Sequence, residues 1–365
     1  MKRLDALLSR GVADGVFPLA RAEVWLDGTR VWHGGNGPED TVFDVASLTK
    51  VMCTTALCLE LHRAGRLPLD TPVNRFFPGS SLVATLFDLL FHRSGLPAFL
   101  PFFTDVLRAH PELHAAECPA ATRAQVRHEV LDRVAKAPAT QAVGAQAVYS
   151  DLGFLLLGSA LEQTMSVALD SLFSELIARP LGLSAGFRRI SAKLPLPASF
   201  ADTGTTRPRE PAPGQEGLWT IDSRPTNRGE VDDDNAWVLD GVAGHAGLFA
   251  TASDAAQFGQ VVLDGERLAP PIAWAVDTLT PGSTRALGFD TPSAGGASCG
   301  PRFGQRGPRG AIGHTGFTGT SLWIDLDRRL VVALLSNRVA LGRSNLKIHD
   351  FRPRFHDAVL DALAL

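Results

Sequence analysis

The stretch DVASLTKVM, residues 44–52, decides how the rest of this 365-residue chain is interpreted. It opens an almost wholly apolar segment, residues 47–62, which predicts a buried central helix that Gly65 stops. Residues three apart share a helix face, so the tips of Ser47 and Lys50 are expected to touch. Ser47 is expected in the first turn, where free N–H groups and the positive end of the helix dipole favour developing negative charge.

This spacing suggests a nucleophile beside its proton acceptor. A serine hydroxyl is a weak nucleophile until a neighbouring group removes its proton. Lysine can do so when its surroundings lower its pKa, whereas arginine stays protonated. The chain has 30 arginines and only 5 lysines, so a lysine at position 50 indicates that a removable proton is needed there. A Ser-x-x-Lys spacing also arises by chance on helices, and the argument therefore needs further motifs.

Two such motifs follow in the chain. The stretch AVYSDLGFLLLG, residues 147–158, holds the only tyrosine, Tyr149, in a protein with 20 phenylalanines. A ring that only filled space could be phenylalanine, so the hydroxyl is expected to be required. The apolar run after it predicts a helix over residues 147–165. The third motif is His314-Thr315-Gly316, just before a C-terminal hairpin.

In this order the three motifs resemble the Ser-x-x-Lys, Tyr-x-Asn and Lys-Thr-Gly motifs of serine β-lactamases and penicillin-binding proteins. The surrounding stretches look like the class C β-lactamase and esterase branch over about residues 10–360: GVFPLARAEVWLDG, TLFDLLFHRSGLP, RGEVDDDNAWVLDGVAGHAGLFATASDAAQF and GHTGFTGTSLWIDLDRRLVVALLSNRV. The resemblance implies an α/β (α+β) fold, a β-lactamase-like antiparallel sheet flanked by helices with an inserted all-helical lobe. We expect a single domain over residues 1–365, with the α/β lobe at about 1–60 and 240–365 and the helical lobe at about 61–239.

The resemblance also implies roles for individual residues. Ser47 is the expected nucleophile, and Lys50 and Tyr149 handle protons, with the tyrosine hydroxyl hydrogen-bonded to both. The oxyanion hole is expected to use the backbone N–H groups of Ser47 and Phe317. The residues expected to bind substrate or the oxyanion are Asp151, His314, Thr315, Gly316 and Phe317. An alternative alignment of Ser150-Asp151 with the Ser-Asp-Asn motif of class A enzymes fails at Leu152.

Two residues depart from the family pattern. Asp151 replaces asparagine, and an anion near Lys50 holds the lysine protonated and weakens it as a base. We therefore expect Tyr149 to be the general base, positioned by a Lys50–Asp151 ion pair. His314 replaces a lysine, and an imidazole with an ordinary pKa of about 6.5 is only partly charged at neutral pH. This change predicts poor affinity for anionic β-lactams and better turnover of neutral esters, amides or small peptides.

Strand patterns at both ends of the chain predict one antiparallel sheet. Residues 21–35 form a hairpin pattern around Asp27-Gly28, and residues 321–325 and 330–335 form a second one. The final stretch, residues 351–365, predicts an amphipathic helix that covers the sheet. Further helices are expected in LFDLLFHRSGLPAF, ending at Ser94-Gly95, and over residues 167–178. The stretch 195–229 is rich in proline and glycine and predicts a long surface loop.

Composition excludes several classes of function. A net charge of −3 disfavours binding to nucleic acid or an anionic membrane, and no run of 18 apolar residues predicts a transmembrane helix. No signal peptide is recognised, so the cytoplasm is expected, or the periplasm if a leader has been removed. No obligatory protein partner is evident. The tandem-glycine stretches lack the frame of a nucleotide-phosphate loop.

No cofactor or metal is predicted. The four cysteines lack the spacing of a zinc or iron–sulfur site and are expected to be buried thiols, with a disulfide as the alternative: Cys53, Cys58, Cys118 and Cys299. The acidic stretch EVDDDNAW, residues 230–237, fails the spacing of a calcium loop. The resembling proteins are expected to have histidine where this chain has Asp232, and a structural turn beside the cleft is predicted here. His245 is expected either to line the site or to be a satisfied loop histidine.

These observations predict a serine hydrolase that forms an acyl-enzyme on Ser47 and acts on small esters or amides. A D-amino-acid peptidase or weak β-lactamase is the first alternative. The second is a non-catalytic, acyl-accepting sensor or scaffold, because two of the three motifs are altered. The expected partner is a small ester, amide or peptide substrate.

Overall fold

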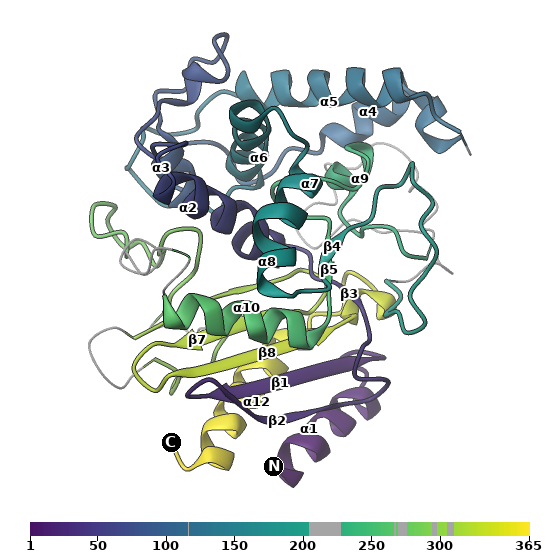
Figure 1. Cartoon of the computed structure of the whole chain (residues 1–365), viewed down its shortest axis with the longest axis vertical. Coiled ribbons are helices and arrows are strands. Elements are labelled where there is room, and N and C mark those ends of the chain that lie inside the picture. Colours follow the sequence, from purple (N-terminus) through teal and green to yellow (C-terminus); the bar gives the residue numbers. More distant parts are fainter. Residues whose placement is uncertain (116, 204–227, 266–267, 269–275, 294–297, 305–309) are drawn as a thin grey trace.

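The computed structural model describes residues 1–115, 117–203, 228–265, 268, 276–293, 298–304 and 310–365. A five-stranded antiparallel sheet with strand order β2-β1-β8-β7-β6 forms its base (Figure 1). Its strands are β1 (Ala20–Leu26), β2 (Thr29–Gly35), β6 (Ala311–Thr315), β7 (Ser321–Asp325) and β8 (Leu330–Ser336). Both predicted hairpins are confirmed, and the pairing of β1 with β8 joins the two ends of the chain into one sheet.

Helices cover both faces of this sheet, with α10 (Ala252–Asp264) on one face and α1 (Lys2–Ala13) and α12 (Ile348–Leu363) on the other (Figure 1). Successive side chains of a strand point to opposite faces. In β8, accordingly, Leu330, Val332 and Leu334 pack with α1 and α12, while Val331, Ala333 and Leu335 belong to the larger core on the α10 side. The C-terminal helix therefore covers the sheet as predicted.

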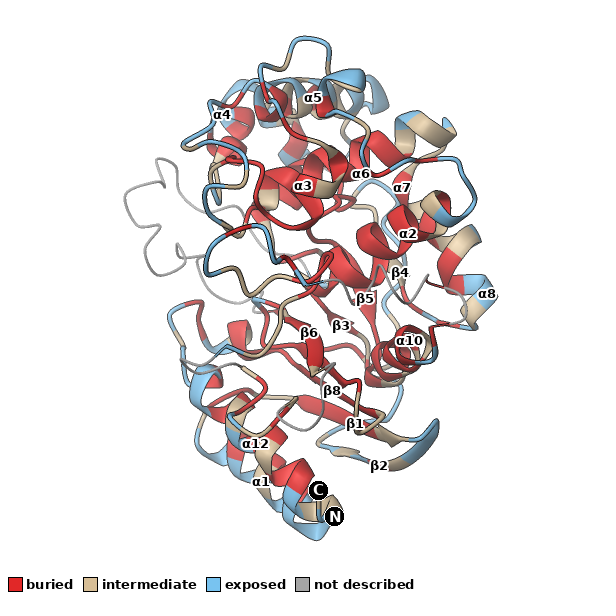
Figure 2. Ribbon diagram, turned by 90° about the vertical axis from the view of Figure 1, so that its left-hand side faces the viewer, coloured by how far each residue is buried: buried red, intermediate tan, exposed pale blue. Residues whose placement is uncertain are grey.

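The helical part of the chain lies above the sheet, on the α10 side (Figure 1). Its helices are α2 (Ala56–Arg63), α3 (Leu86–Leu90), α4 (Phe102–Ala109), α5 (Ala120–Ala135), α6 (Asp151–Met165), α7 (Leu169–Phe173), α8 (Arg179–Leu181) and α9 (Asp234–Val238). Short 3-10 or π turns are η1 (Lys50–Thr55), η2 (Val73–Arg75), η3 (Pro111–His114), η4 (Ser174–Ala178) and η6 (Arg338–Leu341). Figure 2 shows that α2 and α6 are mainly buried, as expected of the centre of the helical part.

A small second sheet with strand order β3-β5-β4 connects the two parts. Its strands are β3 (Phe43–Asp44), β4 (Gly186–Phe187) and β5 (Leu248–Ala250). Because β4 lies within residues 61–239, that stretch is not all-helical, although helices make up most of its regular structure in the described residues. Strand β3 ends just before Ser47, so this sheet supports the start of the central helix.

Three predicted helices differ from the observed ones at their ends. The central helix widens into a π-helical turn at η1, a feature common at functional sites. Helix α3 ends at Leu90, short of the predicted Ser94-Gly95, because His92 adopts a left-handed backbone conformation with φ +56°. Helix α6 begins only at Asp151, capped by the Ser150 side chain, so Tyr149 lies outside the helix. Most of the predicted loop 195–229 lies outside the described residues.

Two sequence expectations concern membranes and thiols. Among the described residues no single helix is long and apolar enough to cross a membrane; α6 passes that test only together with residues 169–181, to which it is bent by 79°. All four cysteines are free thiols, of which Cys53, Cys58 and Cys299 are buried and Cys118 is partly exposed.

Candidate active site

Ser47 is presented by a strained turn between β3 and η1. Ala46 has a φ of +48°, an unfavourable conformation for a residue with a side chain. The Asp44 carboxylate accepts a hydrogen bond from the Ala46 N–H at 2.8 Å, and the Thr49 hydroxyl donates to the Ala46 carbonyl at 2.6 Å. Burial raises the pKa of Asp44 to about 7, although the N–H groups that it binds lower it. These contacts hold Ser47 at the start of the central helix, facing a cavity.

Lys50 is fully buried one turn after the serine. Its Nζ donates to Ser47 Oγ at 3.0 Å and to the His245 carbonyl at 3.2 Å, and it forms an ion pair with Asp151 Oδ1 at 2.7 Å. Burial disfavours the ammonium, but the charges of Asp151 and Tyr149 outweigh burial and raise the pKa of Lys50 above its ordinary value. The predicted ion pair is therefore present, and it keeps Lys50 protonated.

Tyr149 lies beside Lys50 and Ser47, in the extended segment before α6. Lys50 Nζ lies 4.8 Å from the centre of its ring, and the Arg285 guanidinium carbon lies 5.2 Å from it. Burial raises the pKa of Tyr149, as does Asp151, while the charge of Lys50 and hydrogen bonding to Lys50 and Ser47 lower it; the net effect is a raised pKa. Tyr149 therefore rests as a neutral phenol, and the ammonium does not make the phenolate its resting form.

His314 lies in the edge strand β6 with only 4% of its surface exposed. Its Nδ1 lies 2.7 Å from the Thr315 carbonyl, so Nδ1 carries the proton, and Nε2 is buried without a hydrogen-bond partner in the described chain. Burial, together with the charges of Lys50 and Arg285, lowers the pKa of His314 to about 3. The expectation of a partly charged imidazole is therefore wrong, because a desolvated histidine among cations stays neutral.

The loop after β6 packs directly against the turn that presents Ser47. A Cβ added at Gly316 would lie 2.1 Å from Thr320 Oγ1 and 2.4 Å from the Val45 carbonyl, so only glycine fits this approach. The backbone N–H groups of Ser47 and Phe317 have no hydrogen-bond acceptor in the described part of the chain, and both residues line the cavity. Unpaired N–H groups at this position are suited to an oxyanion.

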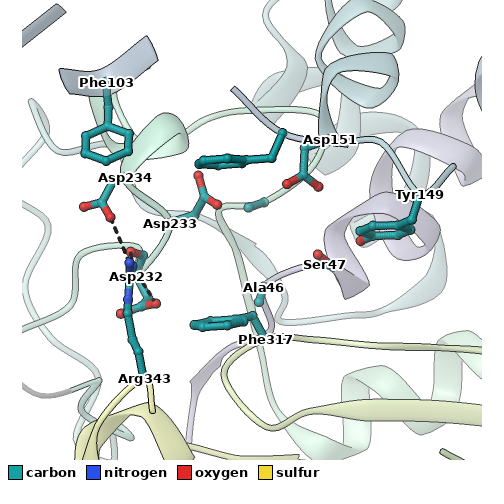
Figure 3. A pocket seen from close by; sticks show the side chains of 12 residues that line it. Ala46, Ser47, Phe103, Tyr149, Asp151, Asp232, Asp233, Asp234, Phe317 and Arg343 are labelled. Carbon is teal, nitrogen blue, oxygen red and sulfur yellow. Dashed lines mark hydrogen bonds and ion pairs between the residues drawn. The ribbon is translucent and has the colours of Figure 1, made fainter. Parts of the chain in front are cut away.

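Two hollows meet at Ser47, Tyr149 and Phe317. We call the first, of about 730 Å³, the acidic half; Figure 3 shows Asp232, Asp233, Asp234 and Arg343 across it from Ser47. Its other lining residues include Phe99, Phe103 and Asp151. We call the second, of about 1120 Å³, the basic half; besides the shared residues it is lined by Arg285, Asp290, His314, Thr315, Gly316, Arg338, Leu346, His349 and Arg352. Ser47 thus lies between regions of opposite charge.

The acidic half is formed by the loop predicted to be a structural turn. Arg343 bridges Asp232 at 3.0 Å and Asp234 at 3.1 Å, as Figure 3 shows. The third carboxylate, of Asp233, pairs with His245 Nε2 at 3.0 Å. Although burial raises the pKa of Asp233, the His245 imidazole beside it lowers that pKa to about 2. The loop therefore lines the cleft as well as forming a turn.

His245 does not line either hollow and belongs with the structural residues. It is buried, pairs with Asp233 and offers its carbonyl to Lys50. Within the described residues, no group of three His, Cys, Asp or Glu side chains is arranged to hold a metal ion.

The basic half has more positive than negative charge. Arg285 lies 3.6 Å from Asp290, but no carboxylate of the described chain pairs with Arg338 or Arg352, which donate to backbone carbonyls such as those of Phe317 and Gly316. Burial lowers the pKa of Arg338 to about 10 and that of Arg352 to about 9, so both remain cationic at neutral pH.

Position 314 is therefore uncharged, but arginines from three separate segments supply positive charge to the same hollow. Sequence reasoning missed them because arginine is abundant in this chain and none of the three belongs to a motif. It missed Phe99 and Phe103 for a similar reason, since nothing distinguishes them from the other phenylalanines before the chain is folded.

Comparisons with known proteins show the family of the chain. The family model described as Beta-lactamase matches residues 4–352. An N-acetylmuramyl-L-alanine amidase of Bacillus subtilis is 29% identical over 380 residues, covering 93% of this chain and 81% of that protein. A putative D-alanyl-D-alanine carboxypeptidase of Salmonella heidelberg is 27% identical over 342 residues, covering 88% of this chain and 75% of the relative.

Solved structures share the fold. EstCE1, a hydrolase with promiscuous acyltransferase activity, superposes with a TM-score of 0.68 at 18% identity, over 96% of this chain and 98% of its own. The octameric penicillin-binding protein homologue from Pyrococcus abyssi gives a TM-score of 0.70 at 17% identity, over 100% and 77% of the two chains. The chain belongs to the beta-lactamase family, a family of serine hydrolases that act on esters and amides.

Proposed function

We propose that this enzyme hydrolyses short peptides or amides through an acyl-enzyme on Ser47, and that it favours substrates whose leaving group carries a free carboxylate. The observation that carries the proposal is the position of Ser47, beside Lys50 and Tyr149 and next to a hollow lined by arginines. Names of relatives support the same class, since an amidase and a putative D-alanyl-D-alanine carboxypeptidase match most of the chain. A D-amino-acid peptidase is therefore the favoured activity.

The chemistry begins with deprotonated Tyr149 acting as general base. It takes the proton of Ser47 as Oγ attacks the substrate carbonyl, and the Lys50 ammonium stabilises the negative charge. The carbonyl oxygen becomes an oxyanion held by the N–H groups of Ser47 and Phe317. As the C–N bond breaks, Tyr149 gives its proton to the leaving amine. It then takes a proton from water, whose oxygen attacks the acyl carbon, and gives that proton to Ser47 Oγ as the ester bond breaks.

Because Tyr149 rests as a phenol, only a small fraction of the enzyme holds the base at neutral pH. The raised pKa of Tyr149 places loss of this proton at the alkaline end of the pH range. Below that pKa, the fraction of active enzyme rises tenfold for each unit of pH. We therefore expect kcat/KM to increase steadily from neutral to alkaline pH.

The basic half favours a leaving group with a carboxylate. Arg338 and Arg352 keep their charge when buried and bind only backbone carbonyls among the described residues, so a substrate anion adds the missing counter-charge. Hydrogen bonds to charged groups contribute about 1.5–3 kcal/mol, or about 10- to 100-fold in kcat/KM. The acidic half disfavours an anionic acyl group and accommodates an uncharged one against Phe99 and Phe103.

A second candidate is the hydrolysis of small neutral esters, which the aromatic wall of the acidic half favours. An acyl-accepting sensor remains the non-catalytic alternative. All three share acylation of Ser47, and they differ in turnover and in the effect of the leaving-group charge.

The test uses one N-acyl-D-alanyl-D-alanine in two forms, with a free C-terminal carboxylate and with a carboxamide. We expect kcat/KM to be about 10- to 100-fold higher for the carboxylate. Arg352→Gln is expected to remove most of this preference, while Arg354→Gln, an exposed residue on the same helix, leaves it intact.

Three results would contradict the proposal. Equal rates for the two forms support the neutral-ester function, which a p-nitrophenyl ester then measures. A burst without steady turnover supports the sensor. Activity that survives Ser47→Ala rules out the acyl-enzyme altogether.

A further inference from the structure

We propose that His92 is a positioning residue, which fixes the general base Tyr149 by binding the backbone on both sides of it. The proposal rests on the function proposed above, because it assigns a task to a residue of the same site. None of the three motifs includes His92, and it contacts neither hollow.

Two hydrogen bonds join His92 to the residues immediately before and after Tyr149. The His92 carbonyl accepts the Val148 N–H at 2.8 Å, and His92 Nδ1 accepts the Ser150 N–H at 3.0 Å. The imidazole ring also packs on the phenol, with ring centres 4.7 Å apart. A single residue therefore sets both the path of the backbone through Tyr149 and the position of its ring.

The left-handed backbone of His92 makes this arrangement possible. A φ of +56° ends helix α3 and turns the chain, so that the carbonyl and the side chain of one residue both face residues 148–150. Histidine, asparagine and aspartate adopt this conformation more readily than most residues with a side chain. The unfavourable conformation is thus located where it serves the active site.

The next residues extend the same template. The Pro97 carbonyl accepts the Ser150 hydroxyl at 2.7 Å, and the Ala98 carbonyl accepts the Asp151 N–H at 2.9 Å. Residues 92–98 thus hold Tyr149 and Asp151 in adjacent positions facing Lys50. This contact explains why Tyr149 precedes helix α6 instead of joining it.

The imidazole can accept the Ser150 N–H only when it is neutral, with its proton on Nε2. His92 is 2% exposed, and its Nε2 has no hydrogen-bond partner in the described chain. Burial lowers the pKa of His92 well below 6.5, and the charges of Arg285 and Lys50 lower it further, while the hydrogen bond from Ser150 raises it by less. His314, the other titratable group that acts on it, is itself neutral at neutral pH. The imidazole of His92 is therefore neutral at neutral and alkaline pH and keeps its acceptor.

Three variants of His92 separate positioning from packing. His92→Asn places an acceptor where Nδ1 was and tolerates the left-handed backbone. His92→Gln places its amide nearer the position of Nε2, and His92→Phe keeps a ring without any acceptor. We expect Asn to retain kcat within about 3-fold, and Gln and Phe to lose about 10-fold in kcat with KM unchanged, the loss of one buried hydrogen bond.

Thermal unfolding and an active-site titration with an acylating inhibitor first give the fraction of each variant that is folded and active. The rates are then expressed per folded molecule. The loss in His92→Phe is expected to disappear in the Tyr149→Phe background, because both variants impair the same base. Equal loss in Asn, Gln and Phe, or a His92→Phe loss that persists without the Tyr149 hydroxyl, overturns the positioning role. If a Gln or Phe variant does not fold, the comparison of Asn with the unmodified protein decides, and a loss of kcat in Asn overturns the proposal.

Failure of the proposed function gives a different result. In that case Ser47→Ala and Tyr149→Phe leave the rate unchanged before any His92 variant is measured. If Ser47→Ala abolishes turnover, Tyr149→Phe reduces it to a small residual rate, and the His92 series has no effect, only the positioning role is lost.

Discussion

Replacing Asp151 with asparagine removes the counter-ion of the buried Lys50 and changes little else. At 2.7 Å the attraction between the two charges is about 6 kcal/mol for an effective dielectric constant of about 20. The Asp151 side chain is 18% exposed, so water screens part of this attraction and replaces some of it in the variant. We therefore take about 3 kcal/mol, the lower end for breaking a buried ion pair.

The same charge raises the pKa of both Lys50 and Tyr149. Its removal therefore favours loss of a proton from the coupled pair, and about 3 kcal/mol corresponds to about 100-fold in that equilibrium. We expect the rising limb of the kcat/KM profile to move to lower pH in Asp151→Asn. The plateau is expected to fall, since the ion pair also positions the groups, so the position of the limb is the quantity to compare.

Stability should change with pH in a matching way. A raised lysine pKa stabilises the folded state below the unfolded pKa, and this stabilisation is lost as pH rises through the folded pKa. In Asp151→Asn the buried ammonium has no counter-ion, so the deficit of about 3 kcal/mol measured at pH 7 should shrink as pH rises.

The assays are a pH series of kcat/KM and urea unfolding at pH 7 and pH 9. Asp132→Asn, which removes an exposed ion pair with Lys136, is the matched control and should change stability by less than about 1 kcal/mol. A rising limb at the same pH in Asp151→Asn and in the unmodified protein would refute the coupling of Asp151 to the general base.

Three further results are expected. Burial lowers the pKa of His314 to about 3, so its titration should not contribute to the pH profile of kcat/KM near pH 6.5. A step near pH 6.5 that is present in the unmodified enzyme and absent from His314→Asn would contradict the neutrality of His314. Arg343→Met should lower the free energy of unfolding by about 3–5 kcal/mol, since it removes the guanidinium that forms buried ion pairs with both Asp232 and Asp234; a urea midpoint like that of the unmodified protein is the contrary result. Gly244→Ala should destabilise by about 1–3 kcal/mol, because its Cβ would meet a backbone carbonyl oxygen at 2.1 Å, whereas Gly186→Ala, with open space at that position, should have no effect; equal melting temperatures of the two variants contradict this packing.

The sheet and the cluster of Ser47, Lys50 and Tyr149 were predictable because each depends on a short local pattern. Two hairpin patterns at opposite ends of the chain predict that their strands join in one sheet. The structure shows this pairing between β1 and β8. Ser47 and Lys50 are three residues apart on one helix, and a lone phenol in a chain rich in phenylalanine identified Tyr149.

The electrostatics of the site could not be predicted in this way, because they depend on burial and on distant segments. His314 is neutral since packing removes it from water, and the charge expected there comes instead from arginines far apart in the sequence. The end of helix α3 was misjudged because nothing in the apolar pattern marks His92 as left-handed. The carbonyl and the imidazole of His92 bind the residues on either side of Tyr149, in the extended segment before α6.

The central claim is that Ser47 carries the acyl group during turnover, and intact-protein and peptide mass spectrometry test it most directly. After brief exposure to a peptide or ester substrate and an acid quench, we predict one added acyl mass on the peptide that contains Ser47. The adduct should disappear with time in the unmodified enzyme, form much more slowly in Tyr149→Phe, and be absent from Ser47→Ala. Steady turnover without any adduct on Ser47, or with the acyl mass on another residue, would contradict the account.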